Sequence, residues 1–249
     1  MSSRDGIAWA ANLQMEPTRQ TVSATMTTRR AAHLNRYADS PMDDISSPID
    51  LRNMADAQNW AESAMAKRPW RKDFFETIIR ELSAATTKHQ SILELGSGPG
   101  FLAERVLTAL PEVTYFALDF SAAMHTLARQ RLGSLASRVH FREANFKDAQ
   151  WAGTLPTVDA VVTVQAVHEL RHKRHAPAFY ANVRSVLHPG GILLVCDHFL
   201  GADGMADTGL FMSPEEHEFA LLAGGFFKIR LLRKDRGLVL FRAEESIAA

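Results

Sequence analysis

Glycine occupies alternate positions in a short turn at residues 96–100 (Gly-Ser-Gly-Pro-Gly), which directly follows the apolar run 91–95. Glycine lets a backbone turn tightly and lets a ligand approach the main chain closely. A helical apolar pattern follows over 101–110, and Asp119 ends the next apolar run 19 positions after Gly100 (119 − 100 = 19). This order predicts the ligand-binding switch point of a doubly wound α/β sheet, with Asp119 placed to accept two ribose hydroxyls.

The rest of the chain extends this pattern. Apolar runs that predict strands alternate with helical patterns, and together they give a mostly parallel sheet. The strands are expected at 91–95, 113–118, 139–141, 158–164 and 191–196, and the helices at 101–110, 121–132 and 176–187. A helix at 214–223 and strands at 226–232 and 238–242 come last. The link 233–237 is short enough only for an antiparallel pair, so we expect a seven-stranded sheet that ends in an antiparallel hairpin.

The N-terminal part of the chain has a different character. Residues 1–45 lack a steady apolar period, and we interpret them as a flexible tail. Two helices are predicted between about 46 and 88, and they would form a helical cap on a single domain that covers 46–249. No apolar run approaches the ~20 residues that span a bilayer, so we expect no membrane span and a cytoplasmic protein.

Composition and motifs exclude several classes of site. The chain carries 28 Lys plus Arg and 28 Asp plus Glu, a balance that disfavours nonspecific binding of nucleic acid. The single cysteine, Cys196, excludes a disulfide framework and a cysteine-based metal site. A nucleotide-dependent reductase would need glycine at position 101, where Phe101 stands, and no Gly-Lys-Ser/Thr segment marks a phosphate-binding loop.

Segment 94–100 resembles the first motif of class I S-adenosylmethionine-dependent methyltransferases. Asp119 matches the ribose-binding acid of that family, and segments 143–146 and 158–168 resemble the stretches after its third strand and around its fourth. The resemblance covers about residues 70–243. It implies a Rossmann-like methyltransferase fold, S-adenosyl-L-methionine as the cofactor, and an enzyme of the small-molecule type.

The resemblance also implies roles for individual residues. The glycine turn would contact the amino-acid part of the cofactor, Glu94 would organise that turn or lie near the ammonium group, and Gln165 would contact the methionine end through its backbone. Aromatic side chains would cover the adenine, and an amide would bond to its edge. The full set of expected cofactor-binding residues is Glu94, Gly96, Ser97, Gly98, Gly100, Asp119, Phe120, Asn145, Phe146 and Gln165.

His168 is the candidate catalytic residue, because it follows the fourth strand and a histidine near neutrality suits proton removal from an oxygen acceptor. Glu169 and His198 are further candidates. The run 171–175 (Arg-His-Lys-Arg-His) is interpreted as a solvated basic face. Asp197 and His198 form an oxygen and nitrogen pair without a third ligand, so we expect no metal.

The nature of the acceptor is less constrained. The fourth-strand segment lacks an Asn/Asp-Pro-Pro-aromatic motif and the chain lacks a Pro-Cys pair, which favours O- or N-methylation of a small molecule. Two segments are expected to close the pocket: the N-terminal helical segment, with Tyr37, Trp60 and Trp70, and residues 200–212. Three alternatives stay open: a nucleic-acid or protein methyltransferase that docks through the basic run, a noncatalytic S-adenosylmethionine-binding protein, and a nucleotide-dependent reductase, against which Phe101 counts. A homodimer is the assembly we weigh against a monomer.

Overall fold

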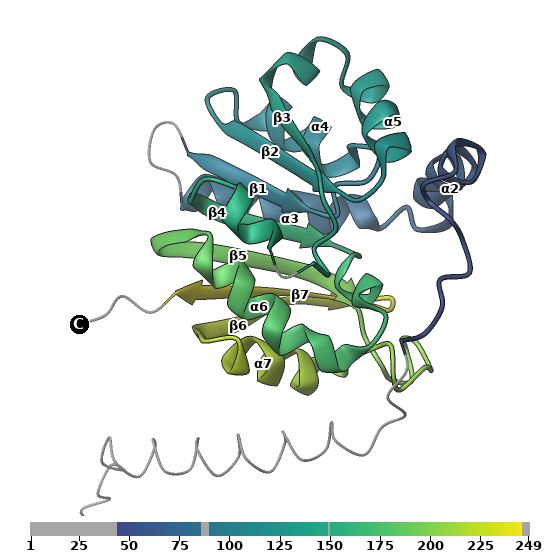
Figure 1. The fold of residues 1–249 in the computed structure, drawn as a ribbon. Coiled ribbons are helices and arrows are strands. Elements are labelled where there is room, and N and C mark those ends of the chain that lie inside the picture. The colour runs from purple at the N-terminus through teal and green to yellow at the C-terminus, as the bar shows by residue number, and fades with distance from the viewer. Residues whose placement is uncertain (1–43, 86–89, 149, 246–249) are drawn as a thin grey trace, which may run out of the picture. The chain divides into compact units, whose positions relative to one another are not determined.

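A seven-stranded sheet forms the centre of the computed structural model, which describes residues 44–85, 90–148 and 150–245. The strand order is β3-β2-β1-β4-β5-β7-β6 (Figure 1). Strands β1 to β5 are parallel, and β7 lies antiparallel between β5 and β6. The predicted doubly wound sheet with a C-terminal antiparallel hairpin is therefore confirmed. The strands are β1 (Ser91–Leu95), β2 (Thr114–Asp119), β3 (Val139–Glu143), β4 (Val158–Val164), β5 (Leu187–His198), β6 (Phe226–Asp235) and β7 (Leu238–Glu245).

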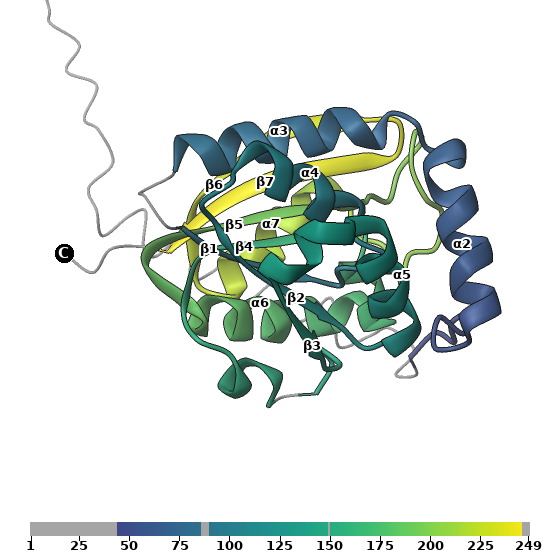
Figure 2. The same ribbon diagram turned by 90° about the horizontal axis from the view of Figure 1, so that it is seen from above.

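Helices cover both faces of the sheet, as Figure 2 shows in the view from above. Side chains of α3 and α4 pack on one face, and side chains of α6 and α7 pack on the other. The α-helices of the described residues are α2 (Met54–Lys67), α3 (Arg71–Ala84), α4 (Phe101–Ala109), α5 (Ala122–Leu132), α6 (Ala176–Ser185) and α7 (Pro214–Ala223). Short 3₁₀ turns occur at η1 (Gly133–Arg138), η2 (Trp151–Thr154), η3 (Val167–Leu170) and η4 (Lys173–His175).

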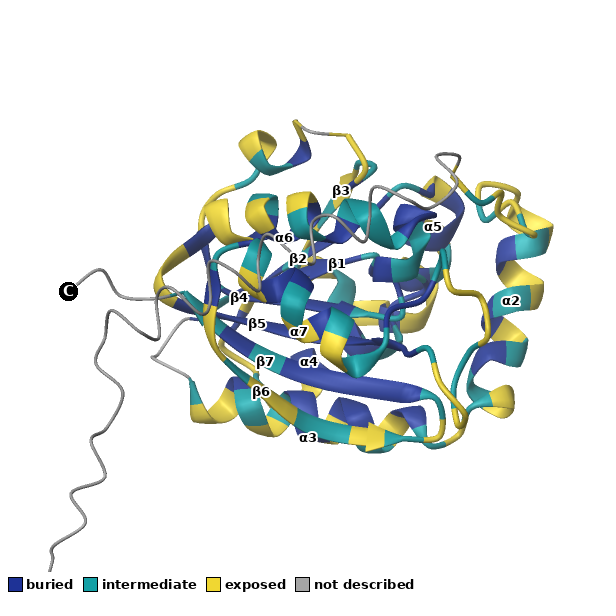
Figure 3. Cartoon of the chain, turned by 90° about the horizontal axis from the view of Figure 1, so that it is seen from below, coloured by how far each residue is buried: buried dark blue, intermediate teal, exposed yellow. Residues whose placement is uncertain are grey.

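The central strands are apolar on both faces because helices cover both faces. Along β4, Val161 faces the cluster that includes α6, whereas Ala160 and Val162 face the cluster that includes α3 and α4. All three side chains are fully buried. Figure 3 shows the same contrast, with dark blue central strands and exposed outer helix faces. This two-sided core holds the carboxyl ends of β1, β2, β4 and β5 at one edge of the sheet.

Several strand boundaries differ from the prediction, and two of these differences have a clear local cause. Strand β5 begins at Leu187 rather than at 191, because Val158 already pairs with Leu187 ahead of a register irregularity. The hairpin link is Arg236–Gly237 alone and not the predicted 233–237. Both link residues have positive φ, 44° and 81°, as a two-residue type I′ turn requires. The sequence offered a single glycine for this turn, and Arg236 adopts the second left-handed conformation.

The N-terminal predictions are covered only partly by the described residues. Most of the predicted tail 1–45, including Tyr37, lies outside them. The expected cap region contains α2 and α3, and α2 lies beyond the carboxyl end of the parallel strands (Figures 1 and 2). Among the described residues, no helix combines the length and the apolar character that crossing a bilayer would take.

Candidate functional site

The glycine turn connects β1 to α4 at the carboxyl edge of the sheet. Gly96 and Ser97 donate their backbone N–H groups to the Leu118 carbonyl at 2.9 and 3.0 Å, which ties the turn to β2. Gly96 and Gly98 have positive φ, and a Cβ on Gly96 would overlap the Cβ of Ala166. The space in front of Gly98 is open to 4 Å. The turn therefore presents bare backbone to a cavity, as a closely approaching ligand needs.

Gly100 has another role in the structure. Its backbone is also left-handed, with φ of 80°, but a Cβ there would meet Ala128 of α5 at 3.2 Å. The residue therefore allows α4 and α5 to approach each other. Gly100 does not line the cavity beside the turn, so the structure does not bring this predicted cofactor residue together with the others.

A cavity of about 240 Å³ lies in front of the turn and brings together most of the predicted site residues. Many of its lining residues lie at or just after the ends of β1, β2 and β4, and others come from the N-terminal segment, the helices and the loop after β5. The predicted residues among them are Gly96, Gly98, Asp119, Phe120, Phe146, Gln165 and His168. Glu94 and Ser97 line a smaller cleft behind the turn, and Asn145 lines a neighbouring cavity together with Phe120 and Phe146.

Asp119 lies at the end of β2 and is almost completely buried. Its carboxylate accepts the Gly98 N–H at 2.8 Å and the Ser121 N–H at 3.0 Å. Burial raises the pKa of Asp119 to about 6, against the opposing effect of these backbone hydrogen bonds. Each oxygen keeps a second lone pair, so the carboxylate can still accept hydroxyl groups from a ligand.

Glu94 lies under the turn and is 3% exposed. The Tyr115 hydroxyl donates a hydrogen bond to its carboxylate at 2.8 Å. Burial raises the pKa of Glu94 to about 8, and the charge of Asp119 adds to the rise. In the absence of a cationic ligand, Glu94 is therefore mostly neutral at pH 7. Tyr115 is a partner that sequence reasoning missed, because alternation along β2 marks it only as a core position.

His168 is held by a buried carboxylate from the neighbouring strand. Its Nδ1 lies 2.7 Å from Asp197 Oδ1, and its backbone N–H donates to Asp197 Oδ2 at 2.8 Å. Its Nε2 lies 3.5 Å from Glu169 Oε1. The bond to Asp197 leaves Nε2 as the nitrogen that can take a proton from a ligand.

Opposite charges dominate the protonation of this pair. Burial lowers the pKa of His168, but the carboxylates of Asp197 and Glu169 outweigh it and raise the value to about 10. Burial raises the pKa of Asp197, but His168 outweighs it and lowers the value to about 2. The sequence interpretation weighed Asp197 only as half of a metal pair. Among the residues that the structure describes, no group of three His, Cys, Asp or Glu side chains could hold a metal ion.

Gln165 takes part through its side chain as well as its strained backbone, whose φ is 53°. Its Oε1 accepts a hydrogen bond from Arg71 Nε, and its Nε2 lies 2.7 Å from His198 Nε2. Arg71 is 4% exposed and lies over the Trp60 ring at 5.5 Å. It lines both the cavity and the cleft behind the turn. Sequence reasoning missed Arg71, because its position at the start of α3 has no local signal.

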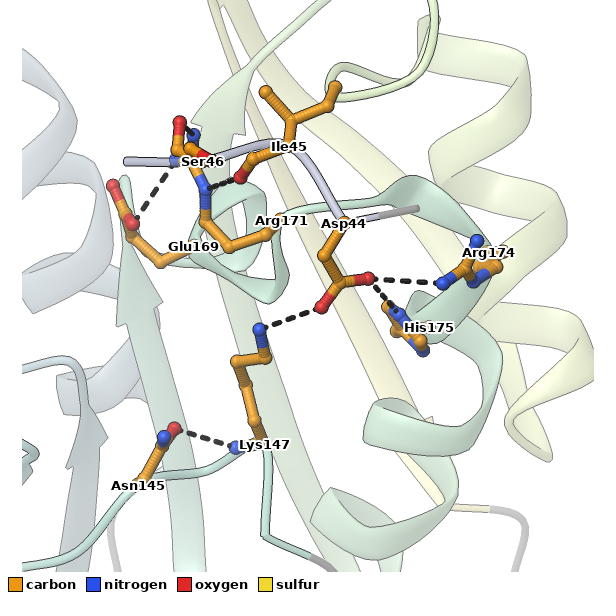
Figure 4. A network of polar contacts seen from close by, with 9 residues as sticks. All are labelled: Asp44, Ile45, Ser46, Asn145, Lys147, Glu169, Arg171, Arg174 and His175. Atoms are coloured by element: carbon orange, nitrogen blue, oxygen red, sulfur yellow. Dashed lines mark hydrogen bonds and ion pairs between the residues drawn. The ribbon is translucent and has the colours of Figure 1, made fainter. Parts of the chain in front are cut away.

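The basic run 171–175 is not the solvated face that the sequence suggested. Arg171 and His172 are 9% and 2% exposed. Arg171 donates to the carbonyls of Ile45 and Ser46 at 2.7 Å each, and Asp44 lies within 3.1 Å of Arg174 and 2.8 Å of His175 (Figure 4). This interpretation was wrong because the N-terminal segment, distant in sequence, supplies partners for the run.

These contacts place the N-terminal segment beside Phe120, Asn145 and Phe146. Residues 47–52 line the space that contains Phe120, Asn145 and Phe146. Lys147 adds an ion pair to Asp44 at 2.9 Å, and its N–H bonds to Asn145 Oδ1 at 3.0 Å (Figure 4). On the other side, Met205 and Phe211 of the predicted closing segment 200–212 line the cavity with His168.

Comparisons with known proteins identify the kind of domain that carries this site. Residues 92–191 match the family model of a methyltransferase domain. This segment is therefore a methyltransferase domain. The matched segment of this methyltransferase domain contains the glycine turn, Asp119, Asn145 and His168. A search of curated proteins found no significant match to the sequence.

Solved structures share the fold of the methyltransferase domain at low sequence identity. An O-methyltransferase family protein from Burkholderia thailandensis has a TM-score of 0.65 and 17% identity, covering 92% of this chain and 71% of its own. Human N-acetylserotonin methyltransferase, solved in complex with S-adenosylmethionine, has a TM-score of 0.63 and 16% identity, with 88% and 67% covered. The CurJ carbon methyltransferase has a TM-score of 0.54 and 14% identity, with 64% of this chain covered. This chain spans only 49% of the CurJ protein.

Proposed function

We propose that this protein methylates a hydroxyl group of a small-molecule acceptor, with His168 as the general base. The observation that carries this proposal is the buried His168–Asp197 pair at the wall of the cavity that also contains Gly98 and Asp119. An oxygen acceptor must lose its proton as it gains a methyl group, and a positioned base provides for that loss. An amine that is already neutral has less need of such a pair. The pair therefore favours O-methylation over N-methylation.

The residues around the turn suit S-adenosylmethionine. Ser97 Oγ is buried without a hydrogen-bond partner among the described residues, and the space beside Gly98 is open. Arg71 is a buried guanidinium whose polar contact is the neutral Gln165. Buried charges are normally paired, so Arg71 suits the carboxylate of the methionine part. Glu94 would face its ammonium group, and Ser97 would supply a hydroxyl.

The nucleoside part would lie toward the N-terminal segment. Asp119 would accept the ribose hydroxyls, and Phe120 would pack beside the adenine. Phe146 would cover the ring, and Asn145 would bond to its edge. Asn145 Oδ1 already accepts the Lys147 N–H, so its side-chain NH₂ is the group suited to donate to the adenine.

When bound, S-adenosylmethionine supplies a methyl group on a positively charged sulfur, which becomes a neutral thioether as the methyl moves to the acceptor oxygen. His168 Nε2 accepts the hydroxyl proton, and Asp197 orients the ring and stabilises the imidazolium that forms. Glu169, 3.5 Å from Nε2, adds to that stabilisation. Because these carboxylates hold the pKa of His168 at about 10, the free enzyme is mostly protonated there at pH 7. Turnover is therefore expected to rise with pH above neutrality.

The alternatives from the sequence are less well supported. A nucleic-acid or protein methyltransferase would use the basic run for docking, but Arg171, Lys173 and Arg174 have partners within the chain. A noncatalytic S-adenosylmethionine-binding protein has no need for a carboxylate aligned on both the ring and the backbone of His168. A reductase would need a glycine where Phe101 stands.

Calorimetric titration with S-adenosylmethionine, S-adenosylhomocysteine and NADH tests the proposal. Micromolar binding of the two sulfur compounds without a response to NADH is expected. A screen of phenols and amines with labelled methyl groups would then identify the acceptor atom. Failure of both sulfur compounds to bind would refute the cofactor assignment, and transfer only to amines would refute O-methylation.

Other features remain predictions from the sequence. They are the cytoplasmic location, a homodimer as the assembly, the flexible tail 1–45 and the single domain 46–249 with its helical cap. Cell fractionation, light scattering and limited proteolysis test them in turn.

A further inference from the structure

The cavity next to His168 has a positive wall. Arg68 at the end of α2 and Arg71 at the start of α3 both line it, together with His198. Among the described residues, neither guanidinium forms an ion pair with a carboxylate, and the only polar side-chain partner of Arg71 is Gln165. Arg71 is buried and Arg68 is half-buried, and a buried charge normally has a counterion, so the wall suits bound anions.

The shifted pKa values of neighbouring groups also indicate a positively charged wall. Burial lowers the pKa of Arg71 to about 10, and the nearby charge of Arg68 lowers it further. Burial also lowers the pKa of His198 to about 4, with Arg68 again among the charges that lower it. His198 is therefore neutral at pH 7, and the positive charge of the wall comes from the two arginines.

The cofactor supplies a partner for one of these arginines. Arg71 shares the cleft behind the turn with Glu94, Gly96 and Ser97, where the methionine carboxylate is proposed to lie. Arg68 does not line that cleft. It lines instead an adjoining open hollow of about 320 Å³, within the roughly 300–1,000 Å³ typical of small-molecule sites. One carboxylate from the cofactor therefore leaves Arg68 without a partner.

The adjoining hollow is basic and has an apolar wall. Lys67, Arg68 and Arg236 line it and face a single carboxylate on its rim, Asp203. Arg236 lies 3.6 Å from Asp235, and both Arg236 and Lys67 are solvent-exposed, so Arg68 contributes the least screened charge. Trp70 and Met205 supply apolar surface beside these cations.

The two spaces are continuous at the acceptor end. Arg68, His198 and Met205 line both of them, and His168 lines the inner one with Phe211. One molecule can therefore place a hydroxyl at His168 and an acidic group at Arg68, with an apolar body between Met205 and Phe211. A guanidinium binds a planar carboxylate through two parallel hydrogen bonds, which fixes orientation as well as charge.

We propose that the acceptor is a hydroxylated carboxylic acid, aromatic in its body, whose carboxylate is bound by Arg68 in the basic hollow beside the cofactor site. This inference rests on the proposed methyltransferase function and names the class of its acceptor. It also assigns Arg68 as the residue that selects acidic acceptors over neutral ones of the same shape.

The test is calorimetric titration of the full chain, saturated with S-adenosylhomocysteine, with matched pairs of small molecules. The probes are 3- and 4-hydroxybenzoic acid and 4-hydroxycinnamic acid, each paired with its primary amide. We expect at least one acid to bind about tenfold or more tightly than its amide, which corresponds to about 1.4 kcal/mol. Raising the salt concentration is expected to reduce the preference.

Variants locate the effect. Arg68→Met is expected to remove the preference for the acid and to leave S-adenosylhomocysteine affinity unchanged, whereas Arg68→Lys retains part of the preference. Lys72→Met is the matched control, because Lys72 is an exposed cation of α3 that lines neither space. Amides that bind as well as the acids, no acid binding to the saturated protein, or an undiminished preference in Arg68→Met would each overturn the proposal. Failure of S-adenosylhomocysteine itself to bind would instead count against the methyltransferase function.

Discussion

Replacing Asp197 by asparagine removes the negative charge that faces His168 and keeps an oxygen that can accept the Nδ1–H hydrogen bond. In the wild type this charge holds the pKa of His168 at about 10, against an ordinary value of 6.5. An opposite charge at hydrogen-bond distance typically accounts for about 1–3 pH units. We therefore expect a pKa between roughly 7 and 9 in Asp197→Asn, a loss of roughly 1.4–4 kcal/mol of stabilisation of the imidazolium. Glu169 remains and limits the fall.

The assay is an NMR titration of the His168 ring in the protein without acceptor, followed by the pH dependence of kcat/KM. The imidazolium is stabilised below the pKa, so the acidic limb of kcat/KM should move to lower pH in the variant. Its plateau should fall by about 10²-fold or more, because the ring becomes a weaker and less well oriented base. Glu218→Gln, which changes an exposed carboxylate on α7, is the control. A His168 pKa that stays within half a unit of the wild-type value would refute the assigned pairing.

Three further predictions concern the cofactor side. In Glu94→Gln the amide oxygen can still accept the hydrogen bond from Tyr115. Because the pKa of Glu94 is raised from 4.5 to about 8, the free energy of unfolding of the wild type should fall as the pH rises from 6 to 8, by up to about 1.4 kcal/mol per pH unit. Urea unfolding should show a shallower slope in the variant, because the raised pKa of His168 still contributes above pH 6.5, and an unchanged slope would contradict the assignment. Arg71→Met should weaken S-adenosylmethionine binding at least tenfold and spare 5′-methylthioadenosine, which lacks the amino-acid part, whereas equal losses would argue against a carboxylate contact. Arg171→Met should speed S-adenosylhomocysteine dissociation in stopped-flow measurements, because residues 45 and 46 lose their anchor; an unchanged rate would show that this segment does not limit release.

The features that the sequence predicted well are those with a local cause. Most strands of the sheet carry their own apolar run, and several turns carry a glycine or a proline. The positive φ of Gly96 and Gly98 follows from a residue type that tolerates it, so the ligand-facing turn could be inferred before its partners were known. The length of the hairpin link was predicted wrongly because Arg236 adopts a left-handed backbone conformation, which an arginine in the sequence does not indicate.

The features that the sequence missed depend on distant partners. Asp197 is 29 positions from His168, and the parallel pairing of Val164 with Cys196 brings the two strand ends together. Arg71 meets Gln165 across 94 positions. The basic run at 171–175 has the composition of a solvated face. The carbonyl groups that accept hydrogen bonds from Arg171 lie 125 and 126 positions upstream, so no local pattern predicts them.

Asp197 is held by the central strands of the sheet, whereas the acceptor side of the cavity is formed mostly by segments at the rim. Asp197 pairs with Val239 in β7, so strands on both sides define which face its side chain takes. A slip of one residue in that pairing would turn the carboxylate to the opposite face and away from His168. Apart from His198 at the end of β5, the side chains proposed to meet the acceptor belong to the end of α2 and to residues 200–212, which take part in no central strand. New acceptor preferences can therefore arise by exchange of rim side chains while the proton-accepting machinery stays in place.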